Sequence, residues 1–377
     1  MKKGENPSIF IGLMSGTSVD GVDCVAVDFR QNTLSIINTA FTQYPDNIRK
    51  QITGLFQPGS DEIRRTGELD IVLGALYADA VLDLISKSKI RPANIAAIGC
   101  HGQTVRHCPP SDSRLGFTLQ IGNPHIIAQK TGITTIADFR SADMASGGQG
   151  APLVPAFHRA VFHSSKKDRV ILNIGGIANI TILKKNGSVY GFDTGPGNTL
   201  LDNWIQKTLG EHYDKNGDWS AGGQMHKELL KNLLSDTYLQ APAPKSTGPE
   251  HFNLGWLQKK LADFQAIPDR DIQATLVHLT AESITTAINT LDETVDEVFV
   301  CGGGSHNTHL MQTIQNKLLP ITVDTTSSLG VDADWVEAVA FAWLAKCRIE
   351  MKPGNLPLVT GARRPAILGA IYEGTTE

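Results

Sequence analysis

The pattern of apolar and polar residues predicts a chain that alternates between short strands and helices. In its first part, runs of β-branched and other apolar residues are typical of strands, while apolar positions three and four residues apart are typical of a helix. The expected elements are strands at 9–13, 22–29 and 34–40, a helix at 68–85, a strand at 95–100, a short helix that begins after Asn123-Pro124 and ends near Gly132, and a strand at 133–139.

The second part of the chain repeats this order from Arg169 onward. The expected elements are strands at 170–175, 177–183 and 189–192, a helical region opening at 198–209, an amphipathic helix at 272–288, a strand at 298–301, a helix capped by Asn307, a strand at 321–323 and a helix at 335–347. Both parts read β-β-β-α-β-α-β, which indicates a duplicated α/β fold. We therefore expect two domains, residues 1–165 and 166–377, with the C-terminal segment able to pack back on the first.

A stretch of small residues separates the first two predicted strands. Residues 15–18 (Ser-Gly-Thr-Ser) leave room for backbone N–H groups and hydroxyls to bind an anion, as glycine-rich turns do with phosphate. The Asp20-Gly21 pair is expected to supply the positive φ of a close hairpin turn. The stretch is therefore either a nucleotide phosphate loop on a hairpin or an ordinary polar turn.

Composition and charge narrow the range of partners. The chain has 377 residues, with 34 Lys and Arg against 38 Asp and Glu, and no basic stripe, so nucleic acid is not an expected partner. No apolar run approaches the roughly 20 residues that cross a bilayer and no secretory leader is visible, so we expect a soluble, cytoplasmic protein without a membrane partner. Five scattered cysteines without CxxC spacing are expected to be reduced, buried thiols.

The expected substrate is a small molecule, and the oligomeric state is open. Leu276, Leu279 and Ile284 form one apolar face of the predicted helix at 272–288. This face could serve a homodimer, although a place in the core is the more common role for such a helix.

Three glycine-rich segments, each at the end of a predicted strand, resemble the loops of one superfamily. They are residues 16–21, 173–179 and 301–307. Their places in a duplicated pattern resemble the ribonuclease-H-like fold of the sugar kinase, heat-shock protein 70 and actin superfamily, in which ATP lies in a cleft between two domains. The resemblance implies that the first two segments are phosphate loops and that the third is an adenosine loop.

A narrower resemblance covers nearly the whole chain, from about Ile9 to Ala362. Its motifs are Met14-Ser15-Gly16-Thr17-Ser18-Val19-Asp20-Gly21-Val22-Asp23, His101-Gly102-Gln103-Thr104, Asn173-Ile174-Gly175-Gly176-Ile177-Ala178-Asn179, Asp193-Thr194-Gly195-Pro196-Gly197-Asn198 and Cys301-Gly302-Gly303-Gly304. These motifs resemble the 1,6-anhydro-N-acetylmuramic acid kinase family. The resemblance implies an ATP-dependent sugar kinase of peptidoglycan recycling, which opens the 1,6-anhydro ring with water, phosphorylates O6 and gives N-acetylmuramic acid 6-phosphate.

The implied reaction makes a chemical demand on the site. O6 of the anhydro sugar is tied to C1, so a water at C1 needs a general base while O6 leaves toward the γ-phosphoryl group, and one carboxylate can suffice. Asp193 follows a predicted strand and precedes a Gly-Pro-Gly turn, and the matching Asp is the family's proposed base. The alternative for Asp193 is a structural role as a helix cap or turn former.

The nucleotide side of the site is expected to combine the three glycine-rich segments with Mg²⁺. Asp20 is the expected metal-binding residue, because Mg²⁺ takes few carboxylates and keeps its waters; alternatively, Asp20 only forms the turn. Asp23 is a second candidate for holding the metal. No GxxxxGK[ST] segment is present, which excludes a P-loop mechanism. The residues expected to bind ATP are Gly16, Thr17, Ser18, Val19, Asp20, Gly21, Val22, Asp23, Gly175, Gly176, Asn179, Gly302, Gly303 and Gly304.

The sugar side needs a cation, because the muramyl lactyl group is anionic. Arg140, just beyond a predicted strand end, and Arg106 are candidates for contact with a carboxylate, with a surface position as the alternative for Arg106. The segment around Asp143 and Gln149 is either part of this site or a hinge. The residues expected to contact the substrate are His101, Gln103, Arg140, Gln149 and Asn198.

Other functions on the same fold stay open. Another small-sugar kinase would use Asp193 to deprotonate an alcohol, without water at C1. An actin-like or chaperone-like ATPase would bind protein partners instead of a sugar. A glycosidase that works without ATP is disfavoured, because the phosphate loops would have no purpose.

Overall fold

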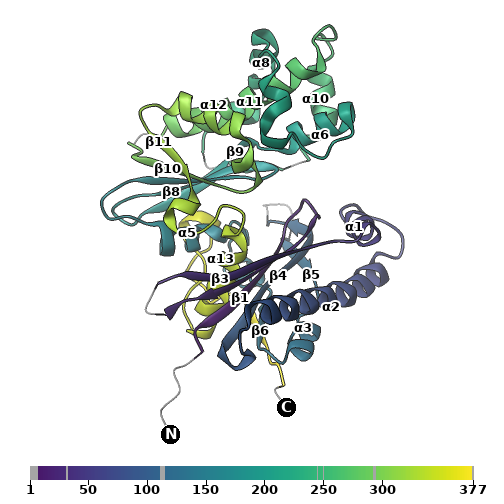
Figure 1. Ribbon diagram of the computed structural model, residues 1–377, viewed down its shortest axis with the longest axis vertical. Helices are drawn as coiled ribbons and strands as arrows, with labels where there is room; N and C mark the ends of the chain where they lie inside the picture. The colour runs from purple at the N-terminus through teal and green to yellow at the C-terminus, as the bar shows by residue number, and fades with distance from the viewer. Residues whose placement is uncertain are drawn as a thin grey trace. The chain divides into compact units, whose positions relative to one another are not determined.

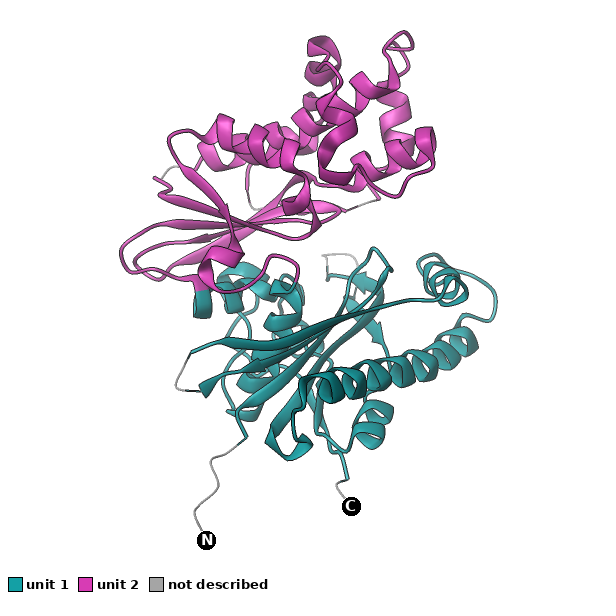
Figure 2. Cartoon of the chain, viewed as in Figure 1, with its two compact units in different colours: residues 1–161, 335–377 teal, residues 162–334 magenta. Residues whose placement is uncertain are grey.

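The computed structural model describes residues 7–30, 33–110, 115–243, 245–248, 250–291 and 294–375. The chain groups into two compact units, coloured separately in Figure 2: unit 1 holds residues 1–161 and 335–377, and unit 2 holds residues 162–334. The chain thus leaves unit 1 and returns to it. The domain boundary expected after residue 165 stays a prediction, because a compact unit is not by itself a domain that folds alone.

Unit 1 is built on a mixed sheet with the strand order β12-β6-β4-β1-β2-β3, and β5 pairs with β4 (Figure 1). Its strands are β1 (Ile9–Ser15), β2 (Gly21–Asp28), β3 (Ser35–Gln43), β4 (Ile95–Cys108), β5 (Phe117–Ile121), β6 (Thr135–Ala137) and β12 (Ala370–Tyr372). The first three form an antiparallel meander, and β4 runs parallel to β1 and β6. Because β1 is central and buried along its length, it holds the first turn at a fixed place.

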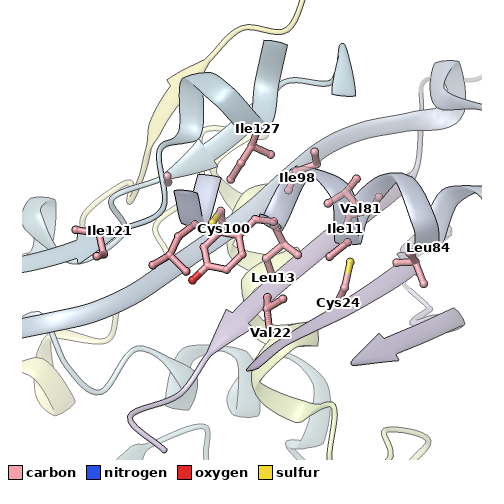
Figure 3. Close-up of a cluster of buried hydrophobic side chains, with 14 of the residues drawn as sticks. Ile11, Leu13, Val22, Cys24, Val81, Leu84, Ile98, Cys100, Ile121 and Ile127 are labelled. Carbon is pink, nitrogen blue, oxygen red and sulfur yellow. The ribbon is translucent and has the colours of Figure 1, made fainter. Parts of the chain in front are cut away.

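Helices cover both faces of the unit 1 sheet. They are α1 (Asp46–Thr53), α2 (Glu62–Ser88), the 3₁₀ helix η2 (Pro92–Asn94), α3 (Pro124–Thr131), α4 (Ser141–Ala145), α5 (Val154–Phe162), α13 (Val336–Ile349) and α14 (Pro357–Thr360). On one face, α2 meets β1, β2 and β4 in the core cluster of Figure 3. On the other face, α13 approaches so closely that a Cβ on Gly12 would lie 1.8 Å from the Ala338 carbonyl oxygen, so glycine is required there.

The structure confirms some of the elements expected in unit 1 and corrects others. Asn123 caps α3 by accepting hydrogen bonds from the N–H groups of His125 and Ile126, and the helix ends at Gly132 as predicted. The end expected at residue 100 for the fourth strand was wrong, because β4 continues to Cys108 by pairing with β5, which was not predicted. The expected strand at 133–139 is reduced to β6.

Unit 2 has a mixed sheet with the order β11-β10-β7-β8-β9. Its strands are β7 (Arg169–Ile174), β8 (Ile177–Leu183), β9 (Val189–Pro196), β10 (Glu297–Cys301) and β11 (Thr322–Thr325). Strands β7, β8 and β9 form an antiparallel meander, and β10 runs parallel to β7 and β11. The third strand is longer than expected, so Asp193 lies inside β9 and not after its end, which corrects the prediction.

The helices of unit 2 include an insertion after the meander. They are α6 (Thr199–Leu209), η3 (Lys215–Gly217), α7 (Asp218–Ala221), α8 (Lys227–Leu234), α9 (Thr237–Gln240), α10 (Leu254–Lys260), α11 (Asp269–Asn289), η4 (Gly303–His306), α12 (Thr308–Leu318) and η5 (Thr326–Leu329). Leu276, Leu279 and Ile284 of α11 are all buried in the core of this unit, as expected. Asn307 caps α12 by accepting a hydrogen bond from Leu310 N at 2.9 Å, which confirms the predicted cap.

The two sheets share one topology. Strands β3-β2-β1-β4-β6 of unit 1 correspond in order and direction to β9-β8-β7-β10-β11 of unit 2. Each set is a three-stranded antiparallel meander followed by two parallel strands, which is the ribonuclease-H-like order. The predicted α/β class and its duplication are therefore confirmed. All five cysteines are free thiols, and all but the exposed Cys108 are buried.

Candidate active site

The turn between β1 and β2 takes a conformation that the sequence did not predict. Val19, and not the Asp20-Gly21 pair, carries the positive φ, at 55°. A β-branched residue rarely adopts this conformation, but the Val19 side chain is buried in the unit 1 core, and its N–H donates to the Gly16 carbonyl at 3.3 Å. Gly21 is needed for another reason: a Cβ there would lie 2.3 Å from the carbonyl oxygen of Thr42 on β3.

This turn exposes small polar groups. Thr17, Ser18 and Asp20 are exposed, and the Ser18 hydroxyl donates to Asp20 Oδ1 at 3.0 Å. Hydroxyls and a carboxylate on one tight turn are suited to a phosphate group with its metal ion. Val22 is buried in the core and Asp23 is partly buried on β2, so any contact of Val22 with a nucleotide would have to come from its backbone.

Buried polar side chains of unit 1 fix the turn between β1 and β2 by hydrogen bonds. Gln103 on β4, expected to contact the substrate, is fully buried and donates from Nε2 to the Gly16 carbonyl at 3.1 Å. Ser15 lies 2.7 Å from the Tyr44 hydroxyl and 3.0 Å from that of Tyr77, and burial raises the pKa of Tyr44 to about 12. Gln103 therefore fixes the hairpin.

His101, buried on β4, pairs with Arg140, the partly buried residue that precedes α4. Arg140 donates to His101 Nε2 from Nε at 3.2 Å and from a terminal nitrogen at 2.8 Å, and to the Gly150 carbonyl at 2.8 Å. Burial, with the Arg140 charge, holds the pKa of His101 well below its usual range, so its imidazole is neutral. Burial also lowers the pKa of Arg140 to about 10, which leaves it protonated at neutral pH.

The segment after Arg140 is fixed by a buried carboxylate. Asp143 is fully buried and accepts from Gly150 N at 2.8 Å, from Asn355 Nδ2 at 2.6 Å and from Thr360 Oγ1 at 2.7 Å. Gln149 donates its backbone N–H to the Thr360 carbonyl at 2.8 Å and leaves its side chain exposed. Asp143 is thus a structural hub that ties this segment to the C-terminal part of unit 1, which argues against a simple hinge.

Glu337 is a carboxyl group of this region that the sequence did not single out. It lies in the first turn of α13, and burial raises its pKa while the Arg140 charge opposes that rise. An acidic residue in the first turn of a helix is common, so the sequence carried no signal for it.

In unit 2, the turn at Gly175 and Gly176 packs on the start of α6. The Gly176 carbonyl accepts from Gly197 N at 2.9 Å and from Thr199 N at 3.1 Å, and the Gly175 carbonyl accepts from Asn198 N at 2.8 Å. A Cβ on Gly197 would lie 2.3 Å from the Gly175 carbonyl oxygen. The Asn198 side chain, expected to contact substrate, donates to the Ile174 carbonyl at 3.2 Å and so supports the same turn.

Asp193 lies at an irregular point of the unit 2 sheet. Asn179 pairs with Asp193 and Ala178 with Gly195, so Thr194 is an extra residue in β9. Such a bulge re-aims the side chains beside it, and bulges are frequent next to active sites. Burial raises the pKa of the Asp193 carboxyl despite opposing hydrogen bonds from Thr247 and Ser246, and the charge of Glu250 raises it further.

Two hydrogen bonds reach one oxygen of the Asp193 carboxylate. Ser246 Oγ donates to Oδ2 at 2.9 Å, and Thr247 N donates to the same oxygen at 3.0 Å. The Tyr238 hydroxyl also donates to the Asp193 backbone carbonyl at 2.7 Å. None of these partners was found from the sequence, because they follow in the helical insertion and no motif marks them.

The third glycine-rich segment packs against β7. Gly302 has φ 81°, and a Cβ on it would lie 2.4 Å from Asn173 Oδ1, while a Cβ on Gly304 would lie 2.2 Å from Ile174 Cγ2. Gly303 is exposed between them, and the nearest atom to its Cβ position is 3.9 Å away. The segment can therefore offer bare backbone to a flat ligand at Gly303.

The described residues hold no cluster of three or more His, Cys, Asp and Glu side chains arranged to ligate a metal ion. Nor does any helix among them have the length and apolar character required to span a bilayer. A metal ion that shares its ligands with phosphate needs no such cluster, since Mg²⁺ usually takes one or two carboxylates and keeps its waters.

The duplicated sheet, with a glycine-containing hairpin at the corresponding strand junction of each unit, defines a protein of the class that includes sugar kinases, heat-shock protein 70 and actin. The sequence profile of one family, described as anhydro-N-acetylmuramic acid kinase, matches residues 8–374. The chain belongs to this family.

Proteins with the family's name are similar to this chain over nearly their whole length. One from Pasteurella multocida (strain Pm70) is 51% identical over 364 residues, covering 96% of this chain and 96% of that protein. One from Shewanella sp. (strain MR-4) is 53% identical over 368 residues, covering 97% and 99%. One from Haemophilus influenzae is 49% identical over 377 residues, covering 97% and 98%.

Solved structures are more remote. Component A of (R)-2-hydroxyglutaryl-CoA dehydratase from Acidaminococcus fermentans aligns over 89% of this chain and 96% of that chain with a TM-score of 0.47 and 10% identity. A likeness at this level adds nothing to the family assignment.

Proposed function

We propose that this protein is an ATP-dependent kinase of 1,6-anhydro-N-acetylmuramic acid, which adds water at C1, opens the anhydro ring and phosphorylates O6. Family membership over residues 8–374 supports the substrate class. The observation that carries the chemistry is Asp193, a partly buried carboxylate with a raised pKa and hydrogen bonds to Oδ2 from Ser246 and Thr247. The product is N-acetylmuramic acid 6-phosphate, an intermediate of peptidoglycan recycling.

The reaction balances with Asp193 as its only base. A water oxygen bonds to C1, the C1–O6 bond breaks, and Asp193 takes the proton of the water. O6 then bonds to the γ-phosphorus as the bond to the ADP leaving group breaks. A raised pKa makes the carboxylate a stronger base, and the position of Asp193 in β9, shortly before α6, supports this role.

The residues of the first turn fit a nucleotide phosphate with Mg²⁺. Thr17 and Ser18 offer exposed hydroxyls, and the single exposed carboxylate of Asp20 beside them suits a metal ion that keeps most of its waters. Bound Mg²⁺ would neutralise charge on the β- and γ-phosphates. Gly303 offers open backbone for the adenosine.

Arg140 is the cation that we assign to the lactyl carboxylate. With a pKa of about 10 it is charged at neutral pH, and its three hydrogen bonds to His101 and Gly150 leave two of its five N–H groups for a ligand. Arg106 is a poorer candidate, because its guanidinium already bonds the Leu55 carbonyl at 3.1 Å and Glu62 at 2.8 Å. The need for ATP and the free thiols support a cytoplasmic location.

The proposal is tested by ADP release from Mg-ATP with 1,6-anhydro-N-acetylmuramic acid, beside N-acetylmuramic acid, N-acetylglucosamine and glucose. In ¹⁸O-labelled water we expect ADP release with the anhydro sugar alone and one solvent oxygen at C1 of the product. Asp193→Asn keeps the shape of the side chain and removes the base, so we expect a rate loss of about 10² or more.

Each alternative function gives a different result in the same assay. ADP release with sugars that carry a free 6-hydroxyl would indicate an ordinary sugar kinase on this fold. ATP hydrolysis that no sugar stimulates would indicate an ATPase of the actin or chaperone type. Full activity of Asp193→Asn would keep the kinase and exclude Asp193 as its base.

A further inference from the structure

A short segment of the helical insertion crosses the Asp193 position of β9. We call residues 245–248 the Asp193 strap. The Lys245 carbonyl accepts from Asp193 N at 3.1 Å, while Ser246 Oγ and Thr247 N donate to Asp193 Oδ2 at 2.9 and 3.0 Å. The strap thus bonds the backbone and the carboxylate of one residue at the same time, from a separation of more than 50 positions in the chain.

The strap is itself anchored to the insertion. Lys245 Nζ donates to the carbonyls of Tyr238 and Leu239 at 3.0 and 3.2 Å and lies 4.8 Å from the centre of the Tyr238 ring. The Tyr238 hydroxyl returns to the Asp193 carbonyl at 2.7 Å. Strap, α9 and β9 therefore close a loop of hydrogen bonds around Asp193.

A second ring of contacts holds α9 and the residues after the strap. Asp236 caps α9 through Tyr238 N at 2.9 Å and binds His251 Nε2 at 3.1 Å and Trp256 Nε1 at 2.9 Å. These hydrogen bonds hold α9 and the residues after the strap together within the insertion.

The hydrogen bonds to the Asp193 carboxylate reach only one of its two oxygens among the described residues. Both of those in the described residues reach Oδ2, so Oδ1 is the oxygen left for another partner. A carboxylate oxygen can accept two hydrogen bonds, so Oδ2 takes both donors while Oδ1 keeps its acceptor capacity. A general base needs one oxygen fixed and the other directed at the water.

We propose that Ser246 and the backbone N–H of Thr247 are positioning groups, which hold Oδ2 of Asp193 so that Oδ1 faces the reacting water. This inference rests on the proposed function of Asp193 as the base. The strap does not touch the substrate in this scheme. The strap orients the Asp193 carboxylate, and its hydrogen bonds stabilise the negative charge of that group.

The pKa of Asp193 depends on the titratable and charged groups around it, and a change in the strap alters that pKa. Glu250 follows the strap and raises the pKa of Asp193 by its charge, while the hydrogen bond from Ser246 lowers it. Tyr238 has a raised pKa through burial and the Asp193 charge, and burial lowers the pKa of Lys245. Ser246 and Glu250 therefore act on the same carboxyl in opposite directions.

The test is the pH profile of kcat for the full-length protein with the anhydro sugar and Mg-ATP. Activity falls at low pH as the base is protonated. Ser246→Ala removes one donor, so we expect kcat to fall about tenfold and the low-pH limb to move up by about half a pH unit, with both KM values changed less than about twofold. Glu250→Gln should move the same limb to lower pH.

Two further variants separate positioning from general damage. Ser246→Thr keeps the hydroxyl and should restore most of kcat and the wild-type limb. Ser235→Ala makes the same change elsewhere in the insertion, where the hydroxyl donates to the Asn232 carbonyl, and should leave the profile unchanged.

The outcomes distinguish this inference from the proposed function. An inactive Asp193→Asn protein together with a wild-type profile for Ser246→Ala overturns the strap and keeps the base. A rise in KM for the sugar with unchanged kcat in Ser246→Ala also overturns the inference, because Ser246 would then contact substrate. An active Asp193→Asn protein overturns the base assignment and the strap with it.

Discussion

The two glycine turns occupy the same place in the two sheets, yet they are fixed by different means. In unit 1 the turn is held by side chains. Gln103 donates a hydrogen bond to the Gly16 carbonyl, and Val19, whose backbone has a positive φ, buries its side chain in the core. Gly16 itself is not forced, because a Cβ there would meet nothing closer than 3.4 Å.

In unit 2 the turn is held chiefly by backbone hydrogen bonds, and the Asn198 amide and the Thr199 hydroxyl add side-chain donors to the Ile174 and Gly176 carbonyls at 3.2 and 2.8 Å. The carbonyls of Gly175 and Gly176 accept from three successive N–H groups at the start of α6, and Gly197 must lack a side chain for this approach. A repeated topology therefore does not require that the same contacts support it in both units. A glycine in a family motif can be needed for packing in one unit and be free for a ligand in the other.

A methyl group should be costly where α6 packs on the unit 2 turn and tolerated in the unit 1 turn. Gly197→Ala would place Cβ 2.3 Å from a backbone carbonyl oxygen that cannot swing away, so we expect the free energy of unfolding to fall by about 3 kcal/mol. Gly16→Ala should change it by less than about 0.5 kcal/mol. Urea denaturation of both variants beside the wild type measures the difference.

The kinetics of the tolerated variant extend this test. If phosphate approaches the backbone at Gly16, then Gly16→Ala should raise KM for ATP while its stability is kept. Equal destabilisation by the two substitutions would contradict the proposed difference between the turns.

Burial disfavours the charged form in both units, so it lowers the pKa of a histidine and raises that of a carboxyl group. In unit 1, burial lowers the pKa of His158 to about 3, so stability is lost as pH falls below about 6.5, where the unfolded chain takes up a proton and the folded one does not. In unit 2, burial and the Asp214 charge raise the pKa of Asp202 to about 7, so its contribution is present at low pH and lost as pH rises through 7.

Asp202→Asn should therefore stabilise the protein in a pH-dependent way. We expect a gain of about 2 kcal/mol at pH 8, where the wild-type carboxylate is charged and partly buried, and almost none at about pH 3.5, below the ordinary carboxyl pKa, where both states are protonated. Thermal or urea unfolding at the two pH values measures it. Asp263→Asn, the same change at an exposed position, should have no effect at either pH, and a gain that does not vary with pH would contradict the shifted pKa.

Much of the fold could be predicted because each repeated strand and helix has a local pattern of apolar and capping residues. Strand β8 has the predicted bounds, and the caps at Asn123 and Asn307 lie where the sequence indicated. The extension of β4 was missed because its support is the pairing with β5, which follows after an intervening segment. The placement of α13 on the unit 1 sheet depends on contacts with Gly12 and Gly99, and no local periodicity shows which sheet a helix will join.

The site was less predictable because it also depends on contacts between segments far apart in the sequence. Asp193 could be singled out because it lies in a motif, but its partners Ser246 and Thr247 come from an insertion without one. Residue propensity predicts the positive φ at the Asp20-Gly21 pair, and the structure has it at Val19, where burial of the side chain outweighs the local cost. The individual contacts with ATP, Mg²⁺ and sugar stay predictions.

A substitution at Gln103 separates two roles, the substrate contact that the sequence predicted and the hairpin anchor seen in unit 1. Gln103→Leu removes the donor to the Gly16 carbonyl, so we expect a stability loss of about 1–2 kcal/mol. A displaced turn should also weaken nucleotide binding, with KM for ATP raised about fivefold, since a loss of about 1 kcal/mol in binding corresponds to that factor.

The sugar kinetics decide between the two roles of Gln103. As an anchor of the phosphate turn, Gln103 should leave KM for the anhydro sugar nearly unchanged in Gln103→Leu. A larger rise for the sugar than for ATP would restore the direct contact predicted from the sequence. Gln129→Leu is the matched control, because Gln129 is exposed on α3 and, among the described residues, bonds Glu373 and Thr375 near the C-terminus. A wild-type KM for ATP in the control shows that loss of a glutamine amide matters only where it holds the hairpin.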